Sequence, residues 1–340
     1  MSDAKASGQD PGTIFQLFGA LQASAVLNAA VKLGVFGAID RGAHEATAIA
    51  RALECPPRST RILLDALVAI GLVTKSGETY DATPLARDHL VPGKPMYVGD
   101  VANIFTSPMV WTEMARFDEV VRNDGTLRAD HAETPGNPFW ESFARSSAAM
   151  ALPAAMALDG ILGDHLASKP KAKVLDVAAG SGIFGATLAK RPNVETTLLD
   201  WPNVLAESEV WLQRLGVDRS HVKTIAGDFF QVNWEGPHDV ILLCNVLHHF
   251  DDATCAGILK KASNALAPGG KVAVLEFLYD AEIRNPMGAM FATLMLAWTR
   301  HGQTYSAGDI DRWSKAAGFA STRVVPLQGM PASYVIADKA

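Results

Sequence analysis

Cysteine is scarce in this 340-residue sequence, and so is an excess of charge of one sign. Cys55, Cys244 and Cys255 are far apart and form no C-x-x-C pair, which argues against a disulfide framework and against a thiolate zinc site. The 30 Lys and Arg against 36 Asp and Glu give a formal net charge of −6, which argues against general affinity for nucleic-acid phosphates or anionic membranes. We expect a protein of the reducing cytoplasm, with neither nucleic acid nor membrane among its partners.

Long uninterrupted apolar runs are also missing, and none reaches the length that spans a membrane. The polar stretch 1–10 lacks the charged and then apolar pattern of a signal peptide. We find no internal repeat and no low-complexity tract. With 49% hydrophobic and only 19% charged residues, the chain has the composition of a compact globular protein and is long enough for two domains.

Residues 11–100 have the pattern of a winged-helix unit. Apolar residues between 14 and 33 cover much of the circumference of one helix, more than a surface helix needs, so we expect this helix to be buried against a partner. Short helices at 46–53 and 59–70 are separated by a Pro-Pro break and precede a hairpin over 72–81 that turns at Ser76-Gly77. This pattern predicts a dimerisation domain and therefore a homodimer.

A winged-helix unit can also bind DNA, and its charge favours one use over the other. Residues 1–100 contain nine Lys or Arg and ten Asp or Glu, whereas a module that reads phosphates is normally basic. The helix that would enter the groove, 61–70, consists mainly of apolar residues. Dimerisation is the preferred interpretation, and a DNA-binding regulator is the alternative from another functional class.

The rest of the chain divides into a helical linker, 101–165, and a segment in which strands alternate with helices, 166–340. Such alternation predicts a parallel sheet, with strands expected near 173–177, 196–199, 221–225, 239–244 and 271–277. Two further segments, 322–327 and 333–337, predict a closing hairpin whose last strand runs antiparallel. The expected fold class is therefore α/β, with a Rossmann-like sheet of this kind preceded by the mainly α winged-helix domain.

The first strand of this sheet leads into a glycine turn. Asp176 lies at its end, and Gly180, Gly182 and Gly185 complete a formal G-x-G-x-x-G. Glycines there let the backbone approach a ligand, and the N-terminal end of the following helix favours a carboxylate or phosphate. By itself this motif is weak, and a dinucleotide-binding fold fits it as well.

Two further acids stand at the next strand ends. Asp200 closes the second strand, where a carboxylate can bind a ribose diol, and Asp228 follows the third. An adenine amino group needs such an acid, and Phe229 is available to pack on the purine. NAD and S-adenosylmethionine both satisfy this series.

The segment from Cys244 to Asp252, which contains His248, favours one cofactor. Together with the strand-end acids it resembles the dimeric small-molecule O-methyltransferases of the plant caffeate and bacterial phenazine or hydroxyneurosporene type, and the resemblance covers nearly the whole chain. It implies a winged-helix dimerisation domain, a class I methyltransferase sheet, S-adenosylmethionine as cofactor and a small-molecule acceptor. The expected activity is methylation of a phenolic or enolic hydroxyl on a largely apolar secondary metabolite.

The reaction accounts for the residue type at position 248. Methyl transfer from a sulfonium releases a neutral thioether, which needs no acid. The acceptor oxygen must lose its proton, and imidazole is a usable base near neutrality. The resemblance assigns this base to His248 and assigns to Glu276 the role of orienting it. A carboxylate there also favours the imidazolium that forms.

The resemblance also implies which residues line the two binding sites. For the cofactor these are Ala178, Gly180 and Gly182 at the methionine portion, Asp200 at the ribose, Trp201, Asp228 and Phe229 at the adenine, with Cys244 and Asn245 in the same cleft. The expected acceptor pocket lies between the linker and the helix after Pro286, and is lined by Phe105, Met109, Phe143, Met150, Met290 and Phe291.

The sequence departs from the family pattern in three places. Ala178 and Ala179 replace glycines, which suits binding if their φ angles are negative. His249 stands where plant members have aspartate, and Thr304 where a second glutamate is expected. Open alternatives are C- or N-methylation in the same cleft, and a regulator or an inactive relative that binds the cofactor only. A further alternative is C-methylation of a 2-oxo acid that is assisted by a divalent metal ion, with ligands from His248, His249 or His301. No ligand spacing supports such a site, and we expect no bound metal.

Overall fold

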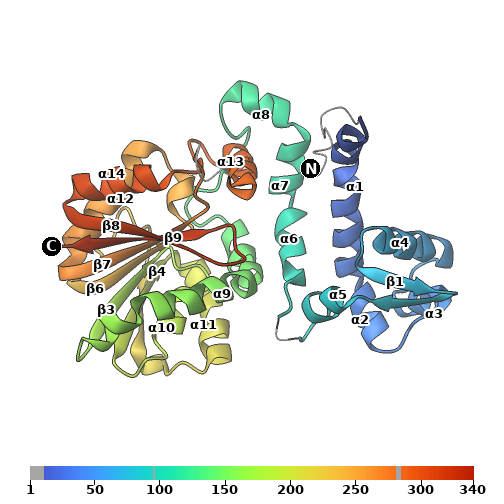
Figure 1. Cartoon of the computed structure of the whole chain (residues 1–340), viewed down its shortest axis with the longest axis horizontal. Coiled ribbons are helices and arrows are strands. Elements are labelled where there is room, and N and C mark those ends of the chain that lie inside the picture. The colour runs from blue at the N-terminus through green and yellow to red at the C-terminus, as the bar shows by residue number, and fades with distance from the viewer. Residues whose placement is uncertain (1–10, 95, 281–284) are drawn as a thin grey trace, which may run out of the picture. The chain divides into compact units, whose positions relative to one another are not determined.

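The computed structural model describes residues 11–94, 96–280 and 285–340 (Figure 1). The chain forms two compact units, Met1–Ala102 and Asn103–Ala340. The predicted linker, 101–165, therefore lies almost entirely in the second unit.

The first unit is mainly helical and contains one hairpin. Its elements are α1 (Pro11–Leu33), α2 (Val35–Asp40), α3 (Ala46–Ala52), α4 (Pro57–Ala69), β1 (Val73–Ser76), β2 (Thr79–Ala82) and α5 (Pro84–His89). The predicted helix over 59–70 begins two residues earlier, because Pro57 fits the first turn of α4, where a missing N–H costs nothing. In the hairpin Ser76 pairs with Thr79, so the turn is Gly77-Glu78 and not Ser76-Gly77.

The core of the first unit explains why α4 is apolar. Leu64 and Leu67 of this helix are fully buried together with residues of α2 and the hairpin. The hydroxyl of Tyr80 in β2 donates a hydrogen bond to Asp65 Oδ1 at 2.7 Å, which ties the hairpin to α4. The apolar residues of the helix over 61–70 are therefore largely used inside the unit.

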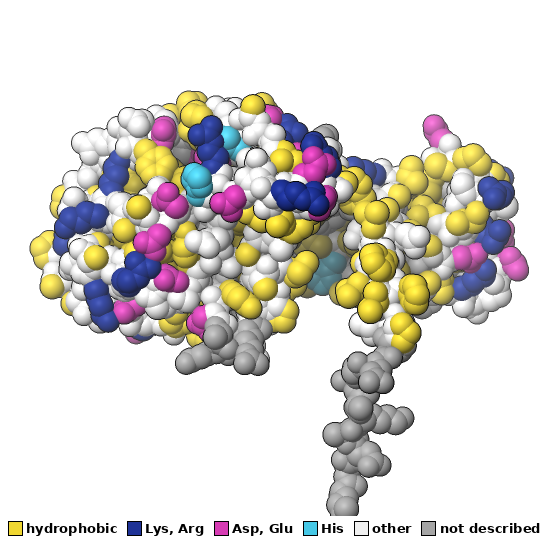
Figure 2. Space-filling model, turned by 90° about the horizontal axis from the view of Figure 1, so that it is seen from above, with side chains coloured by type: hydrophobic (Ala, Val, Ile, Leu, Met, Phe, Trp, Pro, Cys, Tyr) yellow, Lys and Arg dark blue, Asp and Glu magenta, His cyan; other side chains and the backbone are white. Residues whose placement is uncertain are grey.

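Helix α1 leaves most of its apolar side chains uncovered. Within this helix only Ala30 is buried, and the exposed fractions are 57–81% for Ile14, Phe15, Leu17, Phe18 and Leu21. Figure 2 shows hydrophobic side chains gathered at the described start of this helix. Judged by length and composition alone, α1 and the later helix α9 (Phe139–Ala167) are long and apolar enough to cross a membrane.

The second unit opens with helices and continues with a seven-stranded sheet. The helices are α6 (Ala102–Phe105), α7 (Pro108–Ala115), α8 (Phe117–Asn123) and α9 (Phe139–Ala167). The strand order is β5-β4-β3-β6-β7-β9-β8, and the bounds are β3 (Ala172–Val177), β4 (Val194–Asp200), β5 (Val222–Ala226), β6 (His238–Cys244), β7 (Leu266–Glu276), β8 (Phe319–Pro326) and β9 (Ser333–Lys339). Strands β5, β4, β3, β6 and β7 run parallel to one another, and β9 runs antiparallel to its neighbours β7 and β8. This arrangement confirms the predicted fold class.

Helices cover both faces of this sheet (Figure 1). One face is covered by α12 (Asp252–Ala265) and α14 (Ala307–Ala317), which bury Leu175, Ile241 and Leu243. The other face is covered by α9, α10 (Ile183–Leu188) and α11 (Pro202–Leu215), against Val174, Val240 and Leu242. Alternate strand residues thus enter opposite cores, as expected for a sheet buried on both sides. The remaining helix, α13 (Pro286–Trp298), packs against α7 and α8.

Candidate active site

The glycine turn after β3 is held in a left-handed backbone conformation at three positions. The φ angles are +54° at Ala178, +57° at Gly180 and +69° at Gly182. The negative φ that was set as a condition for Ala178 is therefore not met, and this alanine carries strain of about 1 kcal/mol that glycine would avoid. A Cβ added to Gly180 would meet no atom within 4 Å, so the turn has free space beside this residue.

The third glycine of the motif brings α10 close to the sheet. A Cβ at Gly185 would lie 2.6 Å from Thr196 and 2.8 Å from Leu198, both in β4. The Gly185 N–H donates to Asp176 Oδ2 at 2.8 Å, and Asp176 is only 1% exposed. Burial raises the pKa of this carboxyl to about 7. By accepting this hydrogen bond from α10, Asp176 therefore helps to hold the glycine turn in place.

Asp200 joins the glycine turn to the end of β4. Its Oδ2 accepts the Gly180 N–H at 2.8 Å, and its Oδ1 accepts the Trp201 N–H at 2.7 Å. Burial raises the pKa of Asp200 to about 6, although both N–H groups favour the charged form. Trp201 precedes the first turn of α11, so Asp200 fixes two loops at one sheet edge.

The turn after β5 carries Asp228 and Phe229. Asp228 Oδ1 accepts the Phe230 N–H at 2.8 Å, and Trp234 Nε1 donates to the Phe229 carbonyl at 2.8 Å. Lys261 of α12 adds three hydrogen bonds from Nζ, to the carbonyls of Phe229, Phe230 and Val232 at 2.7, 3.0 and 2.9 Å. The sequence-based prediction did not include Lys261. A lysine beside the buried residues Ile258 and Ala262 of α12 was the available signal.

His248 lies in the short 3-10 turn η3 (Leu247–His249) that follows β6. Its Nδ1 is 2.6 Å from Glu276 Oε2, at the end of β7. The other carboxylate oxygen accepts the backbone N–H groups of Leu247 at 2.9 Å and His248 at 3.3 Å. Both side chains are buried, at 3% and 2% exposure. Because a carboxylate accepts the proton of Nδ1, Nε2 of the neutral ring is left without a proton and can act as a base.

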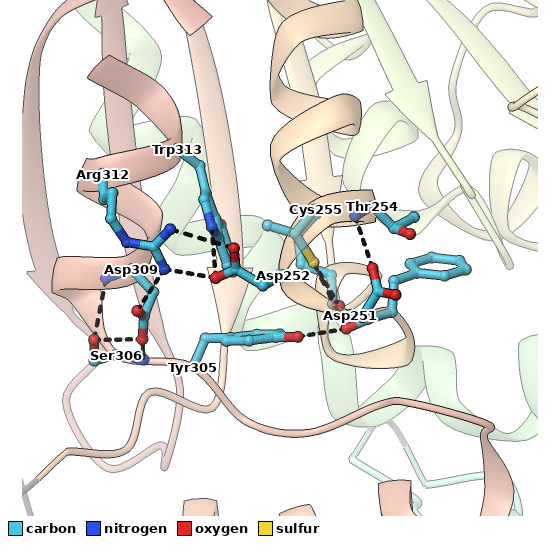
Figure 3. A network of polar contacts seen from close by, with 11 residues as sticks. Asp251, Asp252, Thr254, Cys255, Tyr305, Ser306, Asp309, Arg312 and Trp313 are labelled. Carbon is cyan, nitrogen blue, oxygen red and sulfur yellow. Dashed lines mark hydrogen bonds and ion pairs between the residues drawn. The ribbon is translucent and has the colours of Figure 1, made fainter. Parts of the chain in front are cut away.

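A second set of contacts holds η3 from the side of α12 and α14 (Figure 3). The Tyr305 hydroxyl donates to the Phe250 carbonyl at 2.5 Å, and Cys255 Sγ donates to the Leu247 carbonyl at 3.2 Å. Next to them, Arg312 of α14 forms an ion pair with Asp252 at 2.6 Å, at the start of α12. None of these residues was predicted as part of the site, because their partners are backbone atoms or lie about sixty positions away.

Comparison with known proteins identifies this arrangement. Residues 148–320 match the model of the O-methyltransferase domain, and residues 15–92 match that of the O-methyltransferase dimerisation domain. The chain belongs to the O-methyltransferase family. The resemblance drawn from the strand-end acids and the segment around His248 is confirmed, and this protein is an S-adenosylmethionine-dependent O-methyltransferase that carries a dimerisation domain.

Relatives of this O-methyltransferase cover nearly its full length. It is 28% identical over 337 residues to a 3-hydroxy-5-methyl-1-naphthoate 3-O-methyltransferase of Streptomyces sahachiroi, covering 96% of this chain and 94% of the relative. It is 29% identical to a tetracenomycin polyketide synthesis 8-O-methyl transferase of Streptomyces glaucescens, covering 94% of both. Its structure is similar to that of a putative O-methyltransferase from Nostoc punctiforme PCC 73102, with 33% identity, a TM-score of 0.91 and coverage of 97% and 100%.

Aromatic rings adjoin His248 in the O-methyltransferase. Phe291 of α13 meets the His248 ring edge-on, with centroids 4.7 Å apart, and stacks on Phe277 at 4.3 Å. Trp140 of α9 meets the His249 ring at 5.2 Å and Phe143 at 5.2 Å. Of the predicted pocket residues, the structure thus brings Phe143 and Phe291 near the two histidines.

The other predicted pocket residues divide into two groups. Met109 is 7% exposed and belongs to the same apolar cluster as Phe143 and Phe291. Phe105, Met150 and Met290 are 44%, 42% and 63% exposed. The histidines weighed as alternative metal ligands belong to no larger ligand cluster: within the described ranges no group of three or more His, Cys, Asp or Glu side chains could hold a metal ion.

Proposed function

We propose that this O-methyltransferase methylates a phenolic or enolic hydroxyl of a small, largely apolar secondary metabolite, with His248 as general base. The observation that carries the proposal is the buried 2.6 Å contact between His248 Nδ1 and Glu276 Oε2. Such a pair fixes one tautomer, and it stabilises the imidazolium once Nε2 has taken the acceptor proton. The relatives that act on naphthoate and tetracenomycin hydroxyls support an aromatic acceptor.

We assign the cofactor to the edge of the sheet formed by the loops after β3, β4, β5 and β6. Free space beside Gly180 and the backbone conformation of the turn suit the methionine portion, with Ala178 and Gly182 flanking it. Asp200 suits the ribose, Trp201, Asp228 and Phe229 the adenine, and Cys244 with Asn245 the wall next to His248. Bound there, S-adenosylmethionine supplies the methyl group. The thioether that leaves in the transfer is neutral and needs no proton.

The remaining work falls to residues of the chain. His248 removes the proton of the acceptor hydroxyl, and Glu276 holds the imidazole in place during the transfer. Phe291 and Trp140, beside the two histidines, offer flat apolar surface against which an aromatic acceptor packs. Positioning of the acceptor oxygen contributes most of the further acceleration.

The assembly that we propose follows from the first unit, and the location follows from the state of the cysteines. The match to the dimerisation domain supports a homodimer, and the exposed apolar face of α1 is the surface we assign to it. We propose residues 11–100 as this domain, 101–165 as the segment that contributes to the acceptor pocket, and 166–340 as the catalytic domain. A homodimeric biosynthetic enzyme without a disulfide among its described cysteines suits the cytoplasm.

The test combines product detection with one variant and its control. Incubation with isotope-labelled S-adenosylmethionine and a panel of phenols and 2-oxo acids should give an O-methylated product by mass spectrometry. His248→Ala should abolish turnover and leave the calorimetric affinity for S-adenosylhomocysteine within a fewfold. The control, His301→Ala, changes an exposed histidine and should leave activity unchanged. Turnover by His248→Ala within a fewfold of wild type, or methylation of carbon only, would contradict the proposal.

A further inference from the structure

The backbone of His248 is enclosed from two sides by different parts of the chain. On one side Glu276 accepts the N–H groups of Leu247 and His248, at 2.9 Å and 3.3 Å. On the other side Gly302 lies against the His248 carbonyl, since a Cβ added to this glycine would stand 2.5 Å from the carbonyl oxygen. Both His248 and Gly302 are buried. The position of the histidine therefore depends on Gly302 as well as on Glu276.

Space, and not backbone conformation, requires a glycine at position 302. Its φ lies outside the left-handed region that favours glycine. Ordinary van der Waals contact starts at 3.4 Å, and the obstacle is a backbone atom, which cannot rotate away as the end of a long side chain can. A methyl group here would displace the His248 carbonyl by roughly 1 Å, and a misplacement of that size can cost about a hundredfold in rate.

Thr299 holds Gly302 at this place. This threonine follows the last turn of α13 and is fully buried. Its Oγ1 accepts the Gly302 N–H at 2.7 Å and donates to the Met295 carbonyl at 2.7 Å, while its own carbonyl accepts the Thr126 N–H at 3.3 Å. The hydroxyl thus uses its one proton inside the chain, and it joins the turn 299–302 firmly to the end of α13.

We propose that Thr299 and Gly302 are positioning residues for the base, because the turn that they form sets where His248 stands and hence how Nε2 meets the acceptor hydroxyl. Helix α13 contacts the same histidine a second time, through Phe291, whose ring meets the imidazole edge-on with centroids 4.7 Å apart. One helix and the turn at its end therefore locate both the ring and the backbone of the base. The inference rests on the proposed function, in which His248 removes the acceptor proton.

The experiment compares two acceptors that differ in their need for a base. At neutral pH 1-naphthol must lose its proton, whereas 4-nitro-1-naphthol is already ionised, and kcat is measured for both with saturating S-adenosylmethionine. The variants are Thr299→Val, which keeps the shape of the side chain but cannot accept the Gly302 N–H, and Gly302→Ala. In both we expect kcat for 1-naphthol to fall by about tenfold or more, while kcat for 4-nitro-1-naphthol stays within about threefold.

A conservative variant and two matched controls separate positioning from a general structural role. Thr299→Ser keeps the hydroxyl and should return kcat for 1-naphthol to within about threefold of the wild type. Thr293→Val removes a hydroxyl that bonds the Met290 carbonyl at 2.7 Å in the same helix, and Gly257→Ala adds a Cβ that meets no atom within 4 Å. Both controls should leave the two kcat values unchanged. The calorimetric affinity for S-adenosylhomocysteine should be kept in every variant.

Three results would overturn the inference while His248→Ala is inactive with 1-naphthol, so that the proposed function still stands. They are an equal loss of kcat for both acceptors in Thr299→Val and Gly302→Ala, wild-type kcat for 1-naphthol in these variants, and failure of Thr299→Ser to restore it. Turnover of 1-naphthol by His248→Ala would overturn the proposed function itself. Methylation of neither acceptor by the wild type would overturn both.

Discussion

Glu276 contacts His248 at two places, through the ring at Nδ1 and through the backbone N–H. One carboxylate thus sets both the position of η3 and the tautomer of its histidine. The two functions can be separated by a change that keeps the backbone acceptor and alters the ring contact.

Glu276→Gln is the first prediction. The amide oxygen can still accept the backbone N–H groups, but its NH₂ would face Nδ1, so the ring proton moves to Nε2 and the base is lost. We expect kcat to fall by about 10²-fold or more for a neutral phenol. A nitrophenol that is already ionised at the assay pH should be methylated nearly as fast as by the wild type. An equal loss of kcat for both acceptors would show that the role of Glu276 is only structural.

The second prediction concerns Lys261 and the turn after β5, to which we assign the adenine. Lys261→Met removes three hydrogen bonds to the carbonyls of Phe229, Phe230 and Val232, so the turn loses its support. We expect KM for S-adenosylmethionine to rise by about tenfold and kcat to change little, because the acceptor site is untouched. Lys260→Met, at the exposed neighbouring position, is the matched control. Unchanged KM in Lys261→Met would remove Lys261 from the cofactor site.

The third prediction concerns the support of η3 by Tyr305. Burial raises the pKa of Tyr305, so its hydroxyl stays protonated and donates to the Phe250 carbonyl. We expect Tyr305→Phe to lower kcat by about tenfold while the calorimetric affinity for S-adenosylhomocysteine is kept. Tyr279→Phe changes a tyrosine that is 42% exposed and serves as control. Wild-type kcat in Tyr305→Phe would mean that Cys255 and Glu276 hold the turn without it.

The fourth prediction is a pH dependence of stability that comes from Asp176. Its pKa is about 7 in the folded chain, raised by burial from the ordinary value of 3.8. Between these values the folded chain keeps a proton that the unfolded chain has released, so the free energy of unfolding falls as the pH rises from about 4 to about 7.

Asp176→Asn should remove this dependence, because an amide oxygen still accepts the Gly185 N–H and has no proton to lose. We expect urea unfolding to give nearly equal stabilities at pH 4 and a more stable variant at pH 8, by on the order of 1–4 kcal/mol. Asp118→Asn, at an exposed carboxylate, should show no such difference. A variant that is less stable than wild type at pH 8 would contradict the sign.

The fifth prediction tests the face of α1. Phe15 and Phe18 are 72% and 81% exposed, and a charge at these positions would be costly in an apolar interface. We expect Phe15→Asp with Phe18→Asp to sediment as a monomer where the wild type is a dimer. Val121→Asp changes another exposed apolar residue, at 55%, and should stay dimeric. A dimeric double variant would assign the interface to another surface.

The sequence predicted those parts of the site that depend on strand ends. The strands after which Asp200 and Asp228 stand were recognised by their apolar runs, and parallel strands bring their carboxyl ends to one edge. The six-residue helix α2 was not predicted, because so short an element gives little periodicity. The positive φ of Ala178 could not be predicted, since a single alanine carries no sign that the surrounding turn forces it into the left-handed region.

The supporting contacts were not predictable in the same way. Lys261 and Tyr305 bond to backbone carbonyls 29–32 and 55 positions away, and a carbonyl has no residue type that a sequence pattern could reveal. Two buried atoms that make no hydrogen bond, His249 Nδ1 and Trp298 Nε1, can be recognised only from the structure, because their burial depends on every neighbour.

The bonds from Gly180 and Trp201 to Asp200 also affect how the enzyme ends a cycle. Since the chain itself ties these loops, the cofactor site that we propose is held in shape before the nucleoside binds and independently of the methyl group. Donor and by-product differ by that methyl and one charge, so both should fit this site with similar strength. We therefore expect the by-product to compete with the donor for this site, so that turnover slows as the by-product accumulates.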